Sequence, residues 1–155
     1  MTDFIIKINY SWGDKEHDVE IQKDSKLNAF IYMLDLAKQE MTNTIYDGHE
    51  DDSFSLKVEP NNDSITLTYD YDNEMCYYKL IKKIYCIVIS EFDNIGNRIN
   101  AWEMGCNTNI ENIKQSKQEY EQRLKDGEFE NWGNVLKVEL EVRDYESNDL
   151  IEIID

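Results

Sequence analysis

Hydrophobic and polar residues alternate along several stretches of this chain, which is the pattern of strands with one buried face. In the segment DFIIKINY (3–10), Phe4, Ile6, Ile8 and Tyr10 fall on one face. The run at 76–92 has an ambiguous period, but its β-branched and aromatic residues favour a strand, with a possible break near Lys82–Lys83. Similar patterns predict further strands at 19–22, 53–59, 64–71, 98–105, 135–142 and 149–155.

One stretch changes to the three- and four-residue spacing of a helix that buries one face. Asp24 or Ser25 can cap the start of this helix. The polar residues after it, TNTIYDGHEDD (42–52), predict an acidic loop. The apolar positions of the helix are Leu27, Phe30, Ile31, Leu34, Ala37 and Met41.

A second helix is predicted over 108–126. Thr108 and Glu111 have the spacing of a capping box, and Gly127 can end the helix in the left-handed conformation. Its apolar stripe is narrow, so we expect this helix to lie on a surface. The stripe consists of Ile110, Ile113, Lys117, Tyr120 and Leu124.

Turn signals separate the predicted strands, most clearly at PNND (60–63), which contains the only proline. Repeats, linkers and low-complexity tracts are missing from the sequence, so residues 1–155 are predicted to form a single acidic domain. We predict an α+β fold, with a mostly antiparallel sheet and two helices packed on one face.

The chain is strongly acidic. It has 33 Asp and Glu against 16 Lys and Arg, a net charge of −17. Solubility alone needs a net charge of roughly 2–8 for a small domain, so the excess favours a basic protein partner reached by electrostatic steering. The same charge argues against nucleic acid as a ligand, because phosphate binding requires clustered Lys and Arg. The alternative is an acidic surface that serves only solvation.

The segment TYDYDNE (68–74) places Asp70, Asp72 and Glu74 at alternate positions. A calcium loop starting at Asp70 would need Gly and Glu where Met75 and Ile81 stand, so an EF-hand is excluded. Alternate strand residues are about 6.5–7 Å apart and point side by side, unlike a catalytic pair that faces across a cleft. Two interpretations remain: the solvated face of an outer strand, or negative charges that match the basic groove of a nucleic-acid-acting protein.

If one face meets a basic partner, the sequence predicts it around 47–52 and 70–74. Trp12, in the predicted turn at 11–18, is the candidate aromatic anchor, and the alternative is that it forms the rim of the core. The predicted partner-binding residues are Asp47, Glu50, Asp51, Asp52, Asp70, Tyr71, Asp72, Glu74 and Trp12.

Other candidate chemistry is weak. Cys76, Cys86 and Cys106 have neither the number nor the spacing of a disulfide framework or a zinc site, and Cys86 is expected to be a buried small hydrophobe. His17 and His49 lie among acids and are expected at the surface. The sequence contains no hydrolase elbow and no glycine-rich phosphate loop, so we expect no catalytic, cofactor-binding or metal-binding residues.

Lys7 and Asn9 interrupt the only apolar N-terminal stretch, and no apolar run reaches the roughly 20 residues of a membrane span. We therefore expect a cytoplasmic protein without membrane contact, either a monomer or a homodimer.

In size, acidity, expected compartment and lack of catalytic motifs, the chain resembles the immunity proteins of bacterial polymorphic toxin systems, including contact-dependent inhibition. The resemblance implies a non-catalytic inhibitor that binds a cognate basic, nuclease-like toxin. One alternative is a phage-type anti-defence protein or nucleic-acid mimic that blocks a host nuclease. Others are a small enzyme or ligand-binding module with an unrecognised site, and an acidic protein with no basic partner.

Overall fold

The computed structural model describes the chain except for residues 14, 47–52, 71–72, 134 and 155. Strands dominate, and each strand pair is antiparallel. In chain order, the elements are β1 (Thr2–Tyr10), β2 (Glu16–Lys23), α1 (Lys26–Tyr46), β3 (Phe54–Glu59), β4 (Ser64–Tyr69), β5 (Glu74–Phe92), β6 (Arg98–Asn107), α2 (Ile110–Lys125), β7 (Leu136–Asp144) and β8 (Leu150–Ile154), with a short 3₁₀ turn at Pro60–Asn62. The predicted α+β class with a mostly antiparallel sheet is confirmed.

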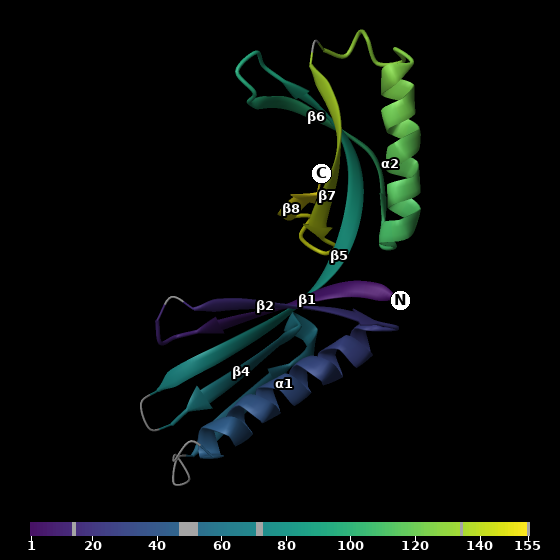
Figure 1. Cartoon of the computed structure of the whole chain (residues 1–155). Coiled ribbons are helices and arrows are strands. Elements are labelled where there is room, and N and C mark those ends of the chain that lie inside the picture. Colours follow the sequence, from purple (N-terminus) through teal and green to yellow (C-terminus); the bar gives the residue numbers. More distant parts are fainter. Residues whose placement is uncertain (14, 47–52, 71–72, 134, 155) are drawn as a thin grey trace. The chain divides into compact units, whose positions relative to one another are not determined.

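The described residues group into two compact units: an N-terminal unit, Met1–Lys82, and a C-terminal unit, Lys83–Asp155. β5 contributes to both units (Figure 1). Its first part pairs with β1 and β4, in the strand order β2-β1-β5-β4-β3. Its second part pairs with β6 and β7, and β8 pairs with β7. That residues 1–155 form a single domain stays a prediction.

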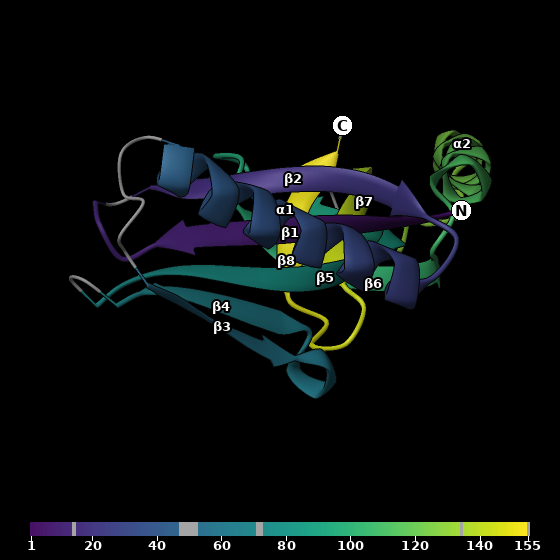
Figure 2. The same ribbon diagram turned by 90° about the horizontal axis from the view of Figure 1, so that it is seen from below.

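In the N-terminal unit, α1 covers one face of the sheet (Figure 2). Side chains from β1, β4 and β5 meet the helix through a stripe of Ala29, Met33 and Ala37, all fully buried. The predicted helix face is therefore shifted, because Leu27 and Ile31 are exposed. The buried sheet residues in this core are Phe4, Ile6, Ile8, Ile65, Leu67, Tyr69, Cys76, Tyr78 and Leu80.

In the C-terminal unit, α2 packs on its own core through Ile113, together with parts of Ile110, Tyr120 and Leu124, as its stripe predicts. Each helix thus packs on a core of its own, whereas the sequence predicts that both helices pack on one sheet face. The buried residues of this second core are Tyr85, Ile87, Ile89, Ile113, Phe129, Val138, Leu140 and Val142.

Helix α1 begins where the sequence predicts but ends later. The Ser25 hydroxyl accepts the N–H of Asn28 at 3.2 Å, so Ser25 caps α1 as one of the two expected residues. α1 continues through the residues predicted as a loop to Tyr46, and the hydroxyls of Thr42 and Thr44 bond to carbonyls one turn earlier.

In α2 the predicted capping box is wrong. The Asn109 side chain, not that of Thr108, accepts the N–H groups of Glu111 and Asn112. Gly127 follows the helix with φ +82°, the left-handed conformation expected of it.

The acidic segment at 70–74 is not the continuous strand face that the sequence predicts. β4 ends at Tyr69 and β5 begins at Glu74, and these two residues pair across a hairpin. Asp70 lies in the connecting turn, and Asn73 there has φ +57°. Consequently Asp70 and Glu74 do not share one strand face.

Candidate functional site

One end of the N-terminal unit holds several of the predicted partner-binding residues. We call residues 10–13, 15–17, 53, 69–70 and 73–75 the loop end. Ser53 donates its hydroxyl to an Asp70 carboxylate oxygen at 2.8 Å, and the Asp70 N–H bonds to the Ser53 carbonyl at 3.0 Å. Ser11 bonds to Met75 through its N–H at 2.8 Å and its hydroxyl at 2.7 Å. The starts of β3 and β5 are thereby tied to the ends of β4 and β1.

Trp12 joins an aromatic cluster at the loop end. Its ring centroid lies 5.0 Å from that of Tyr10 and 5.2 Å from that of Tyr69, and Tyr69 contacts Phe54 at 5.2 Å. Trp12 is half-buried and packs against the core of the N-terminal unit. It is thus a rim residue of the core, one of its two predicted roles, and it lies beside the strand end that leads into Asp70.

The structure brings Trp12, Asp70 and Glu74 to this one end, with Asp70 exposed and Glu74 half-buried. The other predicted partner-binding residues lie outside the described residues, as does His49. They are Asp47, Glu50, Asp51, Asp52, Tyr71 and Asp72.

A surface pocket of about 640 Å³ opens beside Trp12, between the β1–β2 hairpin and the C-terminal part of α1. An adjoining pocket of about 470 Å³ shares Tyr10, Lys15 and Glu16. The described residues that line the larger pocket are Tyr10, Trp12, Lys15, Glu16, His17 and Glu40.

A group of titratable side chains interacts with Glu40. Burial first, and then the neighbouring Cys76 and Glu40, raises the pKa of Tyr10 to about 12. Burial also raises the pKa of the Cys76 thiol to about 11, and raises the pKa of Tyr78 further. At neutral pH Cys76 is therefore a buried thiol rather than a nucleophilic thiolate.

Tyr69 is nine-tenths buried, with 7% of its surface exposed. Burial raises the pKa of Tyr69. Thr44 lowers this pKa, and the charge of Glu40 raises it. In the described part of the chain this hydroxyl makes no hydrogen bond of normal geometry. Thr44 and Glu40 are close enough to this buried hydroxyl to affect its pKa through hydrogen bonding.

Sequence reasoning missed an acidic row on β2. Glu16, Asp18 and Glu20 are all exposed and alternate along the strand. They pair with Asn9, Lys7 and Ile5 of β1 respectively, so their side chains share the sheet face opposite α1. Residues 16–18 are all polar, so the polar-apolar alternation is visible only from 18 onward, and the predicted strand begins at 19.

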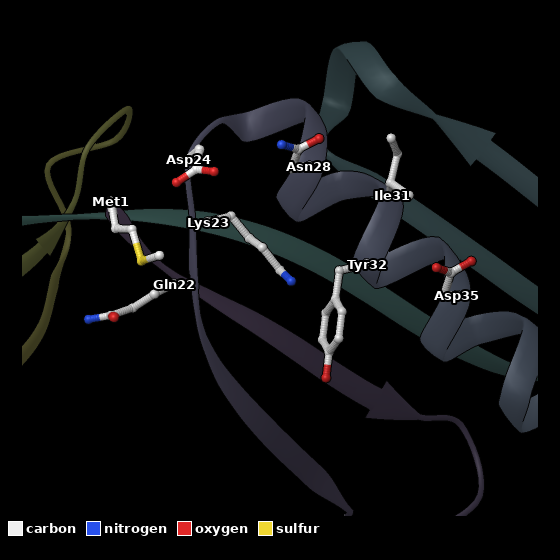
Figure 3. A pocket seen from close by; sticks show the side chains of 8 residues that line it. All are labelled: Met1, Gln22, Lys23, Asp24, Asn28, Ile31, Tyr32 and Asp35. Carbon is white, nitrogen blue, oxygen red and sulfur yellow. The ribbon is translucent and has the colours of Figure 1, made fainter.

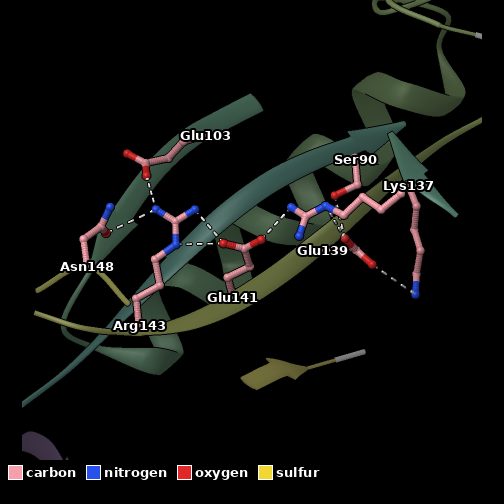
Figure 4. A network of polar contacts seen from close by, with 8 residues as sticks. Ser90, Glu103, Lys137, Glu139, Glu141, Arg143 and Asn148 are labelled. Carbon is pink, nitrogen blue, oxygen red and sulfur yellow. Dashed lines mark hydrogen bonds and ion pairs between the residues drawn. The ribbon is translucent and has the colours of Figure 1, made fainter. Parts of the chain in front are cut away.

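The C-terminal unit contains a buried polar network (Figure 4). Glu141, with 3% of its surface exposed, accepts hydrogen bonds from Arg143 at 2.7 Å and pairs with Arg98 at 2.5 Å. Glu139 accepts the hydroxyl of Ser90 at 2.5 Å and lies 3.6 Å from Arg98.

Arg143 also bonds to Glu103 at 2.6 Å, and Lys137 lies 3.9 Å from Glu139. The network therefore balances three carboxylates with three cations and leaves no net charge for a ligand. We interpret it as structural, because buried carboxylates require such partners.

Cys86 and Cys106 form a disulfide, which corrects the expectation that the cysteines stay unpaired. These residues stand opposite each other on β5 and β6, a neighbourhood that cysteine spacing alone does not reveal. Cys86 is fully buried, as expected. Ligand atoms of Cys86, Glu103 and Cys106 lie within 4.8 Å of one another, but disulfide sulfurs offer no thiolates to a metal.

Disulfides are rare in the reducing cytosol, so this bond weighs against the cytoplasmic location, which stays a prediction.

A separate pocket of the N-terminal unit, of about 440 Å³, lies between β2 and α1 (Figure 3). Here the Nζ atom of Lys23 lies 4.5 Å from the ring centroid of Tyr32. Met1, Asp24 and Asp35 also line it. The chain itself therefore supplies a cation to the aromatic ring of this pocket.

Comparisons with protein-family models, with curated proteins and with solved structures found no match. Among the described helices, neither α1 nor α2 has the length and apolar character needed to cross a membrane.

Proposed function

We propose that this chain is a non-catalytic acidic binding protein that neutralises a basic, nuclease-like toxin, as an immunity protein does. The observation that carries the proposal is the exposed row of Glu16, Asp18 and Glu20, whose first residue, Glu16, also lines the pocket beside Trp12. The row supplies a negative field for encounter, and a half-buried aromatic residue beside it supplies an anchor.

The distribution of charge supports this placement. In the C-terminal unit, Glu139 and Glu141 are buried and bonded to Arg98 and Arg143. The carboxylates of the β2 row are instead exposed to solvent. Exposed charges of one sign raise the association rate of an oppositely charged partner.

A binding role also agrees with the state of Cys76, whose buried thiol stays protonated. Asp70, Glu74 and Trp12 belong to the proposed partner surface, because the structure places all three at the loop end. Asp47, Glu50, Asp51, Asp52, Tyr71 and Asp72 stay predictions of that surface.

The test is affinity capture from a lysate of the source organism at about 50 mM salt, with elution in salt steps. Three tagged proteins are compared: the wild type, a β2-row variant (Glu16→Gln, Asp18→Asn, Glu20→Gln) and a charge-matched control. The control removes three exposed carboxylates of the C-terminal unit through Glu119→Gln, Asp126→Asn and Glu130→Gln. Captured proteins are identified by mass spectrometry and assayed for nuclease activity with and without the chain.

We expect the wild type and the control to retain one basic nuclease above physiological salt and to inhibit it, and the β2-row variant to retain less of it. A host defence nuclease in place of a toxin would favour the anti-defence alternative and contradict an immunity role. A diffuse set of basic proteins that elutes at low salt would contradict any specific inhibitor.

A further inference from the structure

The pocket beside Trp12 contains the groups that bind an organic cation. Its described lining has two aromatic rings, Tyr10 and Trp12, and two carboxylates, Glu16 and Glu40. The rings are inclined by 61° with centroids 5.0 Å apart, so they form an angled aromatic wall. A guanidinium group stacks on aromatic faces and donates hydrogen bonds to carboxylates in the same site.

Negative charge is concentrated at the α1 side of this pocket. Glu40 is half-buried and has no ion-pair partner in the described part of the chain. After burial, its charge is among the causes that raise the pKa of Tyr10 and of Tyr69. The Tyr69 hydroxyl beside it is nine-tenths buried and lacks a hydrogen bond of normal geometry among the described residues.

The pocket between β2 and α1 provides an internal comparison. There Lys23 already lies over the ring of Tyr32 (Figure 3). No described Lys or Arg lies over the rings of Tyr10 or Trp12 in this way. Among the described residues, this chain therefore supplies no cation of its own to the aromatic wall beside Trp12.

The remaining lining residues fit a site at a protein interface. Lys15 and His17 are both exposed. Among the described lining residues, the carboxylates of Glu16 and Glu40 outnumber the ammonium group of Lys15. A volume of about 640 Å³ lies within the range of pockets that bury a drug-sized ligand, enough for a side chain with adjoining backbone.

We propose that this pocket binds an arginine side chain of the basic partner, with the guanidinium between the Trp12 ring and the Glu40 carboxylate. This inference rests on the proposed function for the identity of the partner. Arginine fits better than lysine, because its planar group can stack on Trp12 and donate several hydrogen bonds at once. The pocket thus supplies the specific contact, whereas the β2 row supplies long-range attraction.

The test uses N-acetyl-arginine methylamide as the probe and the citrulline analogue, which has nearly the same shape without the charge, as the control. Binding to the full chain is followed by NMR through the indole N–H signals of the three tryptophans. Trp102 and Trp132 contact each other in the C-terminal unit and serve as internal references. We expect a saturable shift of the Trp12 signal, with a Kd of about 1–10 mM.

Glu40→Gln should weaken arginine binding about tenfold, because it removes the charged acceptor. Asp35→Asn makes the same change of charge on α1 but in the other pocket, and should leave the affinity unchanged. Dispersed amide signals from the N-terminal unit, Met1–Lys82, show that each variant is folded. The proposal is overturned if the citrulline probe binds as well as arginine, if Glu40→Gln binds arginine like the wild type, or if no saturation occurs by about 50 mM.

The two proposals can fail separately. If the arginine probe binds as expected but capture yields no basic nuclease, the pocket stands and the immunity role falls. If a toxin is captured but the probe does not bind, the immunity role stands and the arginine pocket falls.

Discussion

At the scale of single residues, Glu141 shows how this acidic chain keeps a buried carboxylate charged. Burial alone would raise its pKa, but hydrogen bonds from Arg98 and Arg143 outweigh burial and lower the pKa below the ordinary value of 4.5. Its side chain is 5% exposed, so few water molecules can replace these partners. The ionised form is therefore the form that the fold stabilises.

This lowered pKa predicts a particular acid response. Because the folded pKa lies below the unfolded value, Glu141 stabilises the fold above about pH 4.5 and loses this contribution as the pH falls through the folded pKa. Glu141→Gln should remove this part of the pH dependence and lower the free energy of unfolding at pH 7 by about 3 kcal/mol, because it leaves two arginines without their shared partner. Urea titrations at a series of pH values measure both effects.

Glu119→Gln, which removes an exposed carboxylate of α2, should change the stability at pH 7 by less than about 0.5 kcal/mol. If Glu141→Gln lost stability on acidification as steeply as the wild type, the carboxylate would not be held ionised by its arginine partners.

A second prediction concerns the cap of α2. Asn109→Ala should lower the free energy of unfolding by about 1 kcal/mol, because the side chain accepts two backbone N–H groups. Thr108→Ala should have little effect. The two variants, compared by urea unfolding, distinguish the cap in the structure from the capping box that the sequence predicts. A larger loss for Thr108→Ala would favour the capping box.

At the scale of elements, the Cys86–Cys106 disulfide joins β5 to β6, which pairs with no other strand among the described residues. The bond closes a loop with a sequence separation of 20 residues. Reduction should therefore lower the free energy of unfolding by about 3 kcal/mol, mainly by freeing the unfolded chain. The measurement is urea unfolding of the wild type with and without a reducing agent.

Cys76→Ala is the matched control, since Cys76 is a free thiol. This variant should respond to the reducing agent as much as the wild type does, whereas the double variant Cys86→Ala, Cys106→Ala should not respond. Equal stability of the wild type in both conditions would contradict a structural disulfide.

The strands and both helices were predictable from the sequence because each has one face in a core. Their ends were less predictable. The break between β4 and β5 depends on a turn without Gly or Pro, in which Asn73 takes the left-handed conformation. The end of α1 includes Thr42 and Thr44, polar residues typical of a loop, whose hydroxyls bond back to helix carbonyls. Local contacts of this kind are not visible in hydrophobic periodicity.

At the scale of the whole molecule, the sequence shows that the chain is acidic but does not show that the acidic residues belong to two units, each with its own core. Residues 1–82 have 17 acids and 8 bases, and residues 83–155 have 16 acids and 8 bases. Both units are therefore about equally acidic, although they use the charge differently. The paired carboxylates of the C-terminal unit are buried, whereas those of the β2 row are exposed. This difference depends on which strands pair, and the pairs join residues far apart in the sequence.

The candidate site was predictable only in part. Trp12 and Asp70 were expected and lie at the loop end, but Tyr10, Glu16 and Glu40 were not assigned to it. Glu40 comes from the predicted part of α1, and it reaches the pocket because this helix packs on the sheet of the N-terminal unit. A contact between residues 10 and 40 depends on tertiary packing, which the pattern of one sequence does not specify.

The central claim is that the β2 row steers a basic partner to the loop end. The most direct measurement is the association rate constant of the captured partner by stopped flow, over a range of salt concentrations, for the wild type, the β2-row variant and the control variant of Glu119, Asp126 and Glu130. We expect the β2-row variant to associate about tenfold more slowly at low salt and to depend less on salt, while the control stays within about twofold of the wild type. Equal association rates for the two charge variants at low salt would contradict the account.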